Sequence, residues 1–161
     1  MKRSFLSKAL LAILLLSPLL VAAQKLTIQA EDGKTTDLGR ADIESLPHVK
    51  VTIGEGDSQT TYDAVPLKTL LEKVGISLGD SLRGKRMASC LLVEAADDYR
   101  VVIALPEIDP DFTDKQVVLA FLRDGKPLDA KEGPYRIIFP DEKRKARWVR
   151  QVTTLKIVDV K

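Results

Sequence analysis

The segment from residue 141 to residue 151, DEKRKARWVRQ, concentrates five basic side chains and the only tryptophan of the 161-residue chain. Guanidinium groups bind phosphate or carboxylate through paired hydrogen bonds, and an indole ring offers a flat surface for stacking. The segment therefore predicts a pocket for a flat, anionic, heteroaromatic ligand. The alternative is a solvent-exposed edge strand whose charges prevent pairing with other chains.

The directions of these side chains depend on the element that carries them. We expect Lys145 to lie in a loop and a long final strand, rich in β-branched residues, to begin at Ala146. Side chains alternate along a strand, so Trp148 and Arg150 would share one face and Arg147 would lie on the other.

Three further residues are candidates for chemistry. His48 is the only histidine and Cys90 the only cysteine, which argues against a zinc site built from these residue types. His48 is either a general base or a surface residue. Cys90 begins an apolar strand, where a thiol usually packs as a small hydrophobic group. Arg136 is predicted in the middle of a strand, so it needs a partner or a cleft if it points inward.

The charge of the chain argues against a general nucleic-acid binder. The chain has 25 basic and 23 acidic residues. Three of the basic residues and none of the acidic ones lie in residues 1–23, so residues 24–161 carry a net charge of −1. Nucleic-acid-binding domains are usually strongly basic. The basic segment is therefore a local feature of a nearly neutral protein.

Residues 1–23 have the pattern of a secretory signal peptide. A basic start precedes an apolar run, and Val21, Ala22 and Ala23 are the small residues that a signal peptidase recognises. We expect cleavage after Ala23, and contact with the membrane only during export. The alternative is a retained membrane anchor, although the apolar run is short for a span of ~20 residues. Residues 24–161 then form a single domain.

The rest of the sequence predicts mostly strands with a few short helices. Leu67, Leu70, Leu71 and Val74 form one apolar stripe of a helix, and residues 33–47 predict a turn and a second short helix. Strands are expected in 25–30, 48–53, 60–64, 87–105 on both sides of the Asp97-Asp98 turn, 116–122, 133–140 and 146–160. The helices do not alternate regularly with the strands. This order favours an α+β domain with a mixed or antiparallel sheet.

Residues 96–157 resemble the molybdopterin-binding domain of the sulfite oxidase family. Three segments carry the resemblance in the family's order: ADDYRVVIALPEI, VVLAFLRDGKPLDAKEGPYRIIFP and RKARWV. Upstream, TYDAVPLKTLLEKVGI resembles the family's Gly-Val-x-Leu-x-x-Leu-Leu helix start. The resemblance implies one sulfite-oxidase-like domain, with a mixed or antiparallel sheet and a few short helices.

The resemblance also implies where a ligand binds, because in this family the last segment helps to hold the pterin and its phosphate. By that likeness the arginines bind anionic or carbonyl groups and the tryptophan forms a wall of the cleft. The residues implied to bind a pterin or molybdopterin are Arg144, Arg147, Trp148, Arg136, Tyr99 and Lys145.

The main departure from the family concerns the metal. The family's enzymes ligate molybdenum through a cysteine thiolate that lies before the Gly-Val-x-Leu helix start. The matching region here, HVKVTIGEGDSQTTYDAVPL, has no cysteine, and Cys90 follows the helix. Without this soft sulfur donor we expect no molybdenum, no metal ligand and no catalytic residue. In addition, Asp98 stands where the family favours glycine, and Pro134 and Tyr135 are in reversed order.

The sequence thus predicts an exported, periplasmic protein that binds a pterin or molybdopterin without metal chemistry. Its resemblance to small periplasmic members of the superfamily implies a sensor whose partner is the periplasmic domain of a membrane signalling protein. Two alternatives stay open. One is a periplasmic oxidoreductase that depends on a molybdenum cofactor, with Cys90 or a substitute as the metal ligand. The other is a ligand-free adaptor that retains only the fold.

Overall fold

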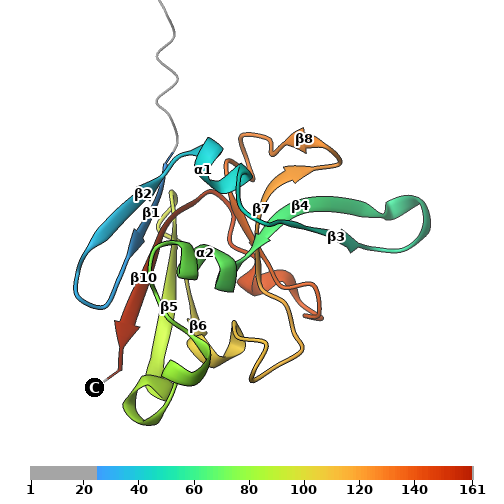
Figure 1. Ribbon diagram of the computed structural model, residues 1–161. Helices are drawn as coiled ribbons and strands as arrows, with labels where there is room; N and C mark the ends of the chain where they lie inside the picture. The colour runs from blue at the N-terminus through green and yellow to red at the C-terminus, as the bar shows by residue number, and fades with distance from the viewer. Residues whose placement is uncertain (1–24, 161) are drawn as a thin grey trace, which may run out of the picture.

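The computed structural model describes residues 25–160, which form two five-stranded β-sheets connected by loops and short helices (Figure 1). The predicted signal peptide, residues 1–23, lies outside the described residues. No helix within residues 25–160 is both long and apolar enough to cross a lipid bilayer. The sheets contain mixed and antiparallel pairings and the helices are few, which confirms the predicted α+β class.

The first sheet has the strand order β2-β1-β10-β5-β6. Its strands are β1 (Leu26–Gln29), β2 (Thr35–Leu38), β5 (Ser89–Ala95), β6 (Arg100–Ala104) and β10 (Val152–Asp159). β1 and β10 run parallel, and the other neighbours are antiparallel. The β5–β6 connection is tight, and Asp98 adopts a positive φ of 65° within it. This confirms the reversal predicted at Asp97-Asp98.

The second sheet is antiparallel throughout. Its strands are β3 (Val49–Ile53), β4 (Thr60–Pro66), β7 (Val118–Arg123), β8 (Lys126–Pro127) and β9 (Arg136–Ile138). β4 and β7 form its centre, and β8 and β9 both pair with β7. Asp124 and Gly125, at φ values of 50° and 74°, make the turn between β7 and β8.

Within residues 25–160, two α-helices and five short 3-10 helices connect the strands. They are α1 (Arg40–Glu44), α2 (Leu67–Lys73), η1 (Gly56–Ser58), η2 (Gly79–Ser81), η3 (Gly84–Ala88), η4 (Leu105–Glu107) and η5 (Lys145–Arg147). The predicted apolar stripe of α2 is the face that it buries, through Leu67, Leu70 and Leu71. Gly75 follows the helix at a φ of 84°, a conformation that glycine adopts without steric cost.

One cluster of buried side chains joins the inner faces of both sheets with α2. Leu91 and Leu155 come from the first sheet, Ala64 and Leu119 from the second, and Leu70 from the helix; each is fully buried. Buried and more exposed side chains alternate along β1 and β6, whereas β4 and β7 each bury four consecutive residues. The core fixes the two sheets, and the loops at their ends form the candidate site.

Two expectations about the strands were wrong. The final strand begins at Val152 rather than Ala146, and the 3-10 turn η5 and a bend occupy the residues before it. Trp148 and Arg150 therefore do not point in directions set by a strand. The expected turn after Gly33 also contains β2, a four-residue edge strand whose Thr and Asp residues gave no apolar alternation.

Asp109 anchors the loop after η4 to α2 and η2. Its side chain is 0% exposed. It accepts hydrogen bonds from Lys68 Nζ at 2.9 Å, from the Asp111 N–H at 3.0 Å and from the Gly79 N–H. Burial alone would raise the pKa of Asp109, but the bonds from Asp111, Lys68 and Gly79 outweigh it and hold this pKa below its ordinary value.

We predict that Asp109→Asn lowers the free energy of unfolding by about 3 kcal/mol, because a buried ion pair loses one partner. A carboxylate with a depressed folded-state pKa stabilises the fold above its unfolded pKa of ~3.9 and loses that contribution as the pH falls through the folded value. The variant should therefore show a weaker loss of stability in acid. Urea unfolding between pH 7 and pH 3 measures both effects, and the exposed Asp114→Asn is the control. Equal results for the two variants would contradict this role of Asp109.

Candidate functional site

Two adjoining hollows lie where loops from both sheets meet. The first, of about 390 Å³, is lined by Asp97, Tyr99, Glu132, Arg136, Lys145, Ala146, Trp148 and Arg150. The second, of about 360 Å³, shares Glu132, Arg136, Lys145 and Trp148 and adds Ile53, Gly54, Ser58, Thr60, Tyr62 and Arg123. Together they have four basic and two acidic side chains, so we call them the cationic pocket.

Six parts of the fold contribute to the cationic pocket, two of which are the end of β7, with Arg123, and the loop before β9, with Glu132. The β5–β6 turn provides Asp97 and Tyr99, and the β3–β4 hairpin provides the side of the pocket between Ile53 and Tyr62. Arg136 begins β9, and η5 with the bend after it provides Lys145 to Arg150. The pocket therefore combines segments that are remote in the sequence.

The ion pair between Arg136 and Glu132 lies at the wall that the two hollows share. Arg136 Nη1 lies 2.5 Å from Glu132 Oε1, and only 11% of the Arg136 side chain is exposed. Arg123 Nη1 lies 3.5 Å from the other carboxylate oxygen. Within residues 25–160, Arg136 Nε and Glu132 Oε2 are buried and have no hydrogen-bond partner. Buried polar atoms without a hydrogen-bond partner are uncommon in native structures. Arg86 Nε and Tyr135 Oη, outside the cationic pocket, are two further examples.

Trp148 is 6% exposed, and its indole is held in place. The Nε1–H donates to the carbonyl of Phe139 at 3.1 Å. The Arg136 guanidinium and the Lys145 ammonium lie 5.2 Å and 4.9 Å from the ring centroid, within the range of cation–π attraction. The indole ring of Trp148 thus forms part of the pocket wall, and the two cations lie over this ring. Lys145 is exposed, so it can move away and open one face of the ring.

Tyr99 connects the β5–β6 turn to η5. Its side chain is 48% exposed, and its hydroxyl donates to the carbonyl of Ala146 at 2.7 Å. Tyr62 forms part of the second hollow, where burial raises the pKa of its hydroxyl although Arg136 partly opposes this shift. The Tyr62 hydroxyl therefore remains protonated at neutral pH and can donate a hydrogen bond.

The structure brings together four of the six predicted residues: Arg136, Tyr99, Lys145 and Trp148. Arg147 lies in a different pocket, of about 140 Å³. It pairs there with Glu142 and with Glu107 at 3.0 Å, and its guanidinium stacks 4.3 Å from the centroid of Phe139. Burial would lower the pKa of Arg147, but the bonds to Glu142 and Glu107 outweigh it and raise this pKa.

Arg144 is exposed and does not line the cationic pocket. Whether Arg144 or Arg147 binds a ligand stays a prediction, but their positions do not support a place beside Arg136. Sequence reasoning also missed residues that line the pocket. Arg150 belongs to the same basic segment and could have been included, whereas Glu132 and Arg123 gave no signal in the sequence.

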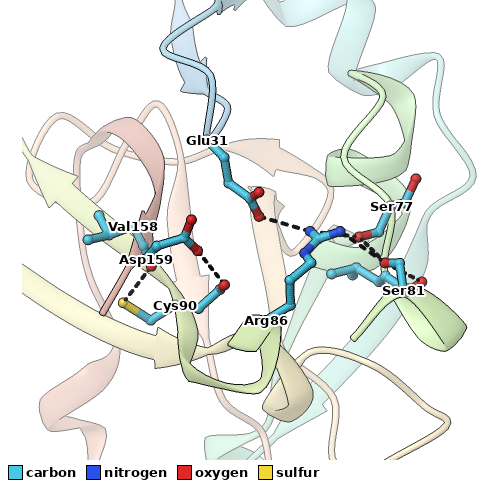
Figure 2. A network of polar contacts seen from close by, with 9 residues as sticks. Glu31, Ser77, Ser81, Arg86, Cys90, Val158 and Asp159 are labelled. Atoms are coloured by element: carbon cyan, nitrogen blue, oxygen red, sulfur yellow. Dashed lines mark hydrogen bonds and ion pairs between the residues drawn. The ribbon is translucent and has the colours of Figure 1, made fainter. Parts of the chain in front are cut away.

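Cys90 lies far from the cationic pocket. It is the second residue of β5, whereas Asp97 follows the end of that strand, a separation of roughly 20 Å at ~3.3 Å per residue. Figure 2 shows its thiol directed toward the carbonyl of Val158, at a distance of 3.6 Å. Burial, with a smaller contribution from Asp159, raises the pKa of the Cys90 thiol.

The surroundings of Cys90 and His48 offer no set of metal ligands. Beside Cys90, Ser89 donates a hydrogen bond to Asp159 at 2.5 Å, and Arg86 pairs with Glu31 (Figure 2). Over residues 25–160, no group of three or more His, Cys, Asp or Glu side chains is placed to hold a metal ion. His48 lies 3.1 Å from the carbonyl of Leu46, away from the cationic pocket.

The two sheets with their few short helices form a sulfite-oxidase-like α+β fold. Among solved structures, the sulfane dehydrogenase SoxCD from Paracoccus pantotrophus has this fold, with a TM-score of 0.65 and 21% sequence identity. The match covers 87% of this chain and 40% of that chain. At this identity the likeness shows the fold alone.

Residues 40–161 match the family described as the oxidoreductase molybdopterin binding domain, and the chain belongs to this family. The family match and the fold confirm the resemblance found in the sequence. A comparison with curated proteins gives no match.

We predict that the Cys90 thiol is unreactive in the folded protein. Its raised pKa reduces the thiolate fraction, and thiolate is the reacting form. At pH 8 an aromatic disulfide reagent should modify the native protein at least about tenfold more slowly than the urea-unfolded protein. Equal rates before and after unfolding would contradict the environment described for this thiol.

Proposed function

We propose that this protein binds a pterin- or molybdopterin-type ligand in the cationic pocket and does not ligate molybdenum through a protein thiolate. The observation that carries the proposal is the Arg136–Glu132 pair. The pair lies at the wall that the two hollows share. Arg136 Nε and Glu132 Oε2 are buried and have no hydrogen-bond partner among the described residues, although Glu132 Oε2 lies 3.5 Å from Arg123 Nη1. Family membership supports a pterin as the ligand class.

The chemistry of the pocket suits a pterin. The amino-pyrimidinone edge of a pterin donates to carboxylates, and Glu132 provides one. Its ring carbonyl and any anionic substituent accept hydrogen bonds, which Arg136, Arg150 and Lys145 can donate. Each charge-assisted bond contributes about 1.5–3 kcal/mol. Stacking on Trp148, once Lys145 has moved, would contribute about 1 kcal/mol more.

The pocket fits the organic part of the cofactor better than a thiolate-bound metal. The segment before α2, where the resemblance places the metal ligand of the enzymes, forms one side of the pocket with Ile53, Gly54, Ser58, Thr60 and Tyr62. None of these carries sulfur, and the only cysteine of the chain lies in β5. This position supports a binding protein over a metal enzyme.

The second candidate is a molybdenum-cofactor-dependent oxidoreductase, which the family's description favours. In this chain the metal would need a ligand other than a cysteine of the pocket, because Cys90 lies at the opposite end of β5. The binding function requires no such replacement.

Location and partner are part of the proposal. The pattern of residues 1–23 supports export to the periplasm. There, we propose, the ligand-bound state is recognised by the periplasmic domain of a membrane signalling protein. The exposed Tyr99 and Lys145 at the rim of the pocket are the residues through which a partner could detect the ligand.

We predict that the protein binds pterin-6-carboxylate, an anionic pterin, and that Arg150→Gln weakens this binding about tenfold through loss of a charge-assisted bond. Calorimetric titration measures the dissociation constants. Arg144→Gln is the matched control, because Arg144 is an exposed arginine of the same basic segment outside the pocket. Equal weakening by both variants would indicate general charge attraction, and no binding by the wild type would refute the proposed ligand class.

A second test concerns the metal. We predict that the protein, exported from cells able to make molybdenum cofactor, contains well below one molybdenum atom per chain. After denaturation it should release a fluorescent pterin. Metal analysis and mass spectrometry of the released compound measure the two contents. Stoichiometric molybdenum that is lost in Cys90→Ala would establish the enzyme instead.

A further inference from the structure

Gln151 has an unusual backbone conformation at the edge of the cationic pocket. Its φ is +50°, in the left-handed region that glycine adopts readily and a long side chain does not. Residues in such conformations persist where the surrounding structure holds them, and they concentrate at functional sites. Gln151 does not itself line the pocket, so its role must pass through its neighbours.

Three hydrogen bonds fix Gln151. Its N–H donates to the Glu132 carbonyl at 2.9 Å, and its own carbonyl accepts from the Ala96 N–H at 3.0 Å. Its side-chain Nε2 donates to the Ala130 carbonyl at 2.6 Å. One residue thus connects the β5–β6 turn, the loop before β9 and the bend before β10.

Each of these three segments contributes to the pocket. Glu132 lines it directly, Asp97 follows Ala96, and Arg150 precedes Gln151. The side-chain bond needs the full length of glutamine. Asparagine would tolerate the backbone conformation better but is one methylene shorter, and glycine would remove the amide. Glutamine at position 151 is therefore explained by its side-chain hydrogen bond to Ala130 and not by the left-handed backbone, which other residues adopt more easily.

We propose that Gln151 is a positioning residue for the ligand. Its left-handed backbone and its amide hold the three segments in register, so that Glu132, Arg136 and Arg150 converge on one bound molecule. The inference rests on the proposed function. It adds a determinant of affinity that does not touch the ligand.

Two variants test this role. Gln151→Met keeps the size of the side chain and removes the donor, whereas Gln151→Gly relieves the backbone strain and removes the side chain. The control is Gln29→Met, at a half-exposed glutamine of β1 outside the pocket. Two properties are measured: the affinity for pterin-6-carboxylate, and acrylamide quenching of the fluorescence of Trp148 in the ligand-free protein. Trp148 is the only tryptophan, so the signal reports this site alone.

We expect both Gln151 variants to bind pterin-6-carboxylate at least about fivefold more weakly, because that factor corresponds to the loss of one hydrogen bond. We also expect stronger quenching of Trp148 in both variants. The melting temperature of Gln151→Gly should stay within about 4 °C of the wild type, because relief of strain offsets the lost bond. Wild-type affinity and quenching in both variants would overturn the inference. A loss of affinity that is no larger than the fall in melting temperature explains would also overturn the inference. If the wild type itself binds no pterin, the proposed function fails, and quenching in the ligand-free protein still decides the role of Gln151.

Discussion

The ion pair between Arg136 and Glu132 is the constraint on which the candidate site depends. Removing two charges from water is costly unless their remaining polar atoms are also matched. Here one atom of each has no hydrogen-bond partner among the described residues, and only Arg123, 3.5 Å from Glu132 Oε2, partly compensates. The pair is kept in place by its surroundings: the indole of Trp148 lies against the guanidinium, and Gln151 holds the backbone of Glu132. The protein thus maintains a local arrangement that stability alone would not favour.

The basic segment that first suggested a ligand is divided between two tasks. Lys145 and Arg150 face the cationic pocket, whereas Arg147 is held between two carboxylates and the ring of Phe139. An arginine held in this way stabilises the turn that presents its neighbours. A run of similar residues therefore does not share one function, and the partners of each residue decide its role.

The fold could be predicted from the sequence wherever local patterns decide it. The stripe of Leu67, Leu70 and Leu71, the alternation in β1 and the Asp-Gly turn after β7 each correspond to an observed element. The segment before β10 could not be predicted, because its bends depend on hydrogen bonds to Glu132 and Ala96, which are distant in sequence. The same holds for the site: residue types indicated Arg136 and Trp148, but only the fold shows that Glu107 and Glu142 engage Arg147.

The strand order of the first sheet affects how the chain folds. β10, the last strand, lies between β1 and β5, so the early β1–β2 pair and the later β5–β6 pair share no neighbour until β10 is in place. A sheet closed by such a distant pairing has a high contact order and is expected to fold slowly. The bend that carries Trp148 and Arg150 leads directly into this strand. Completion of the first sheet and assembly of the pocket therefore depend on the same C-terminal segment, and a chain truncated before residue 145 would lack both.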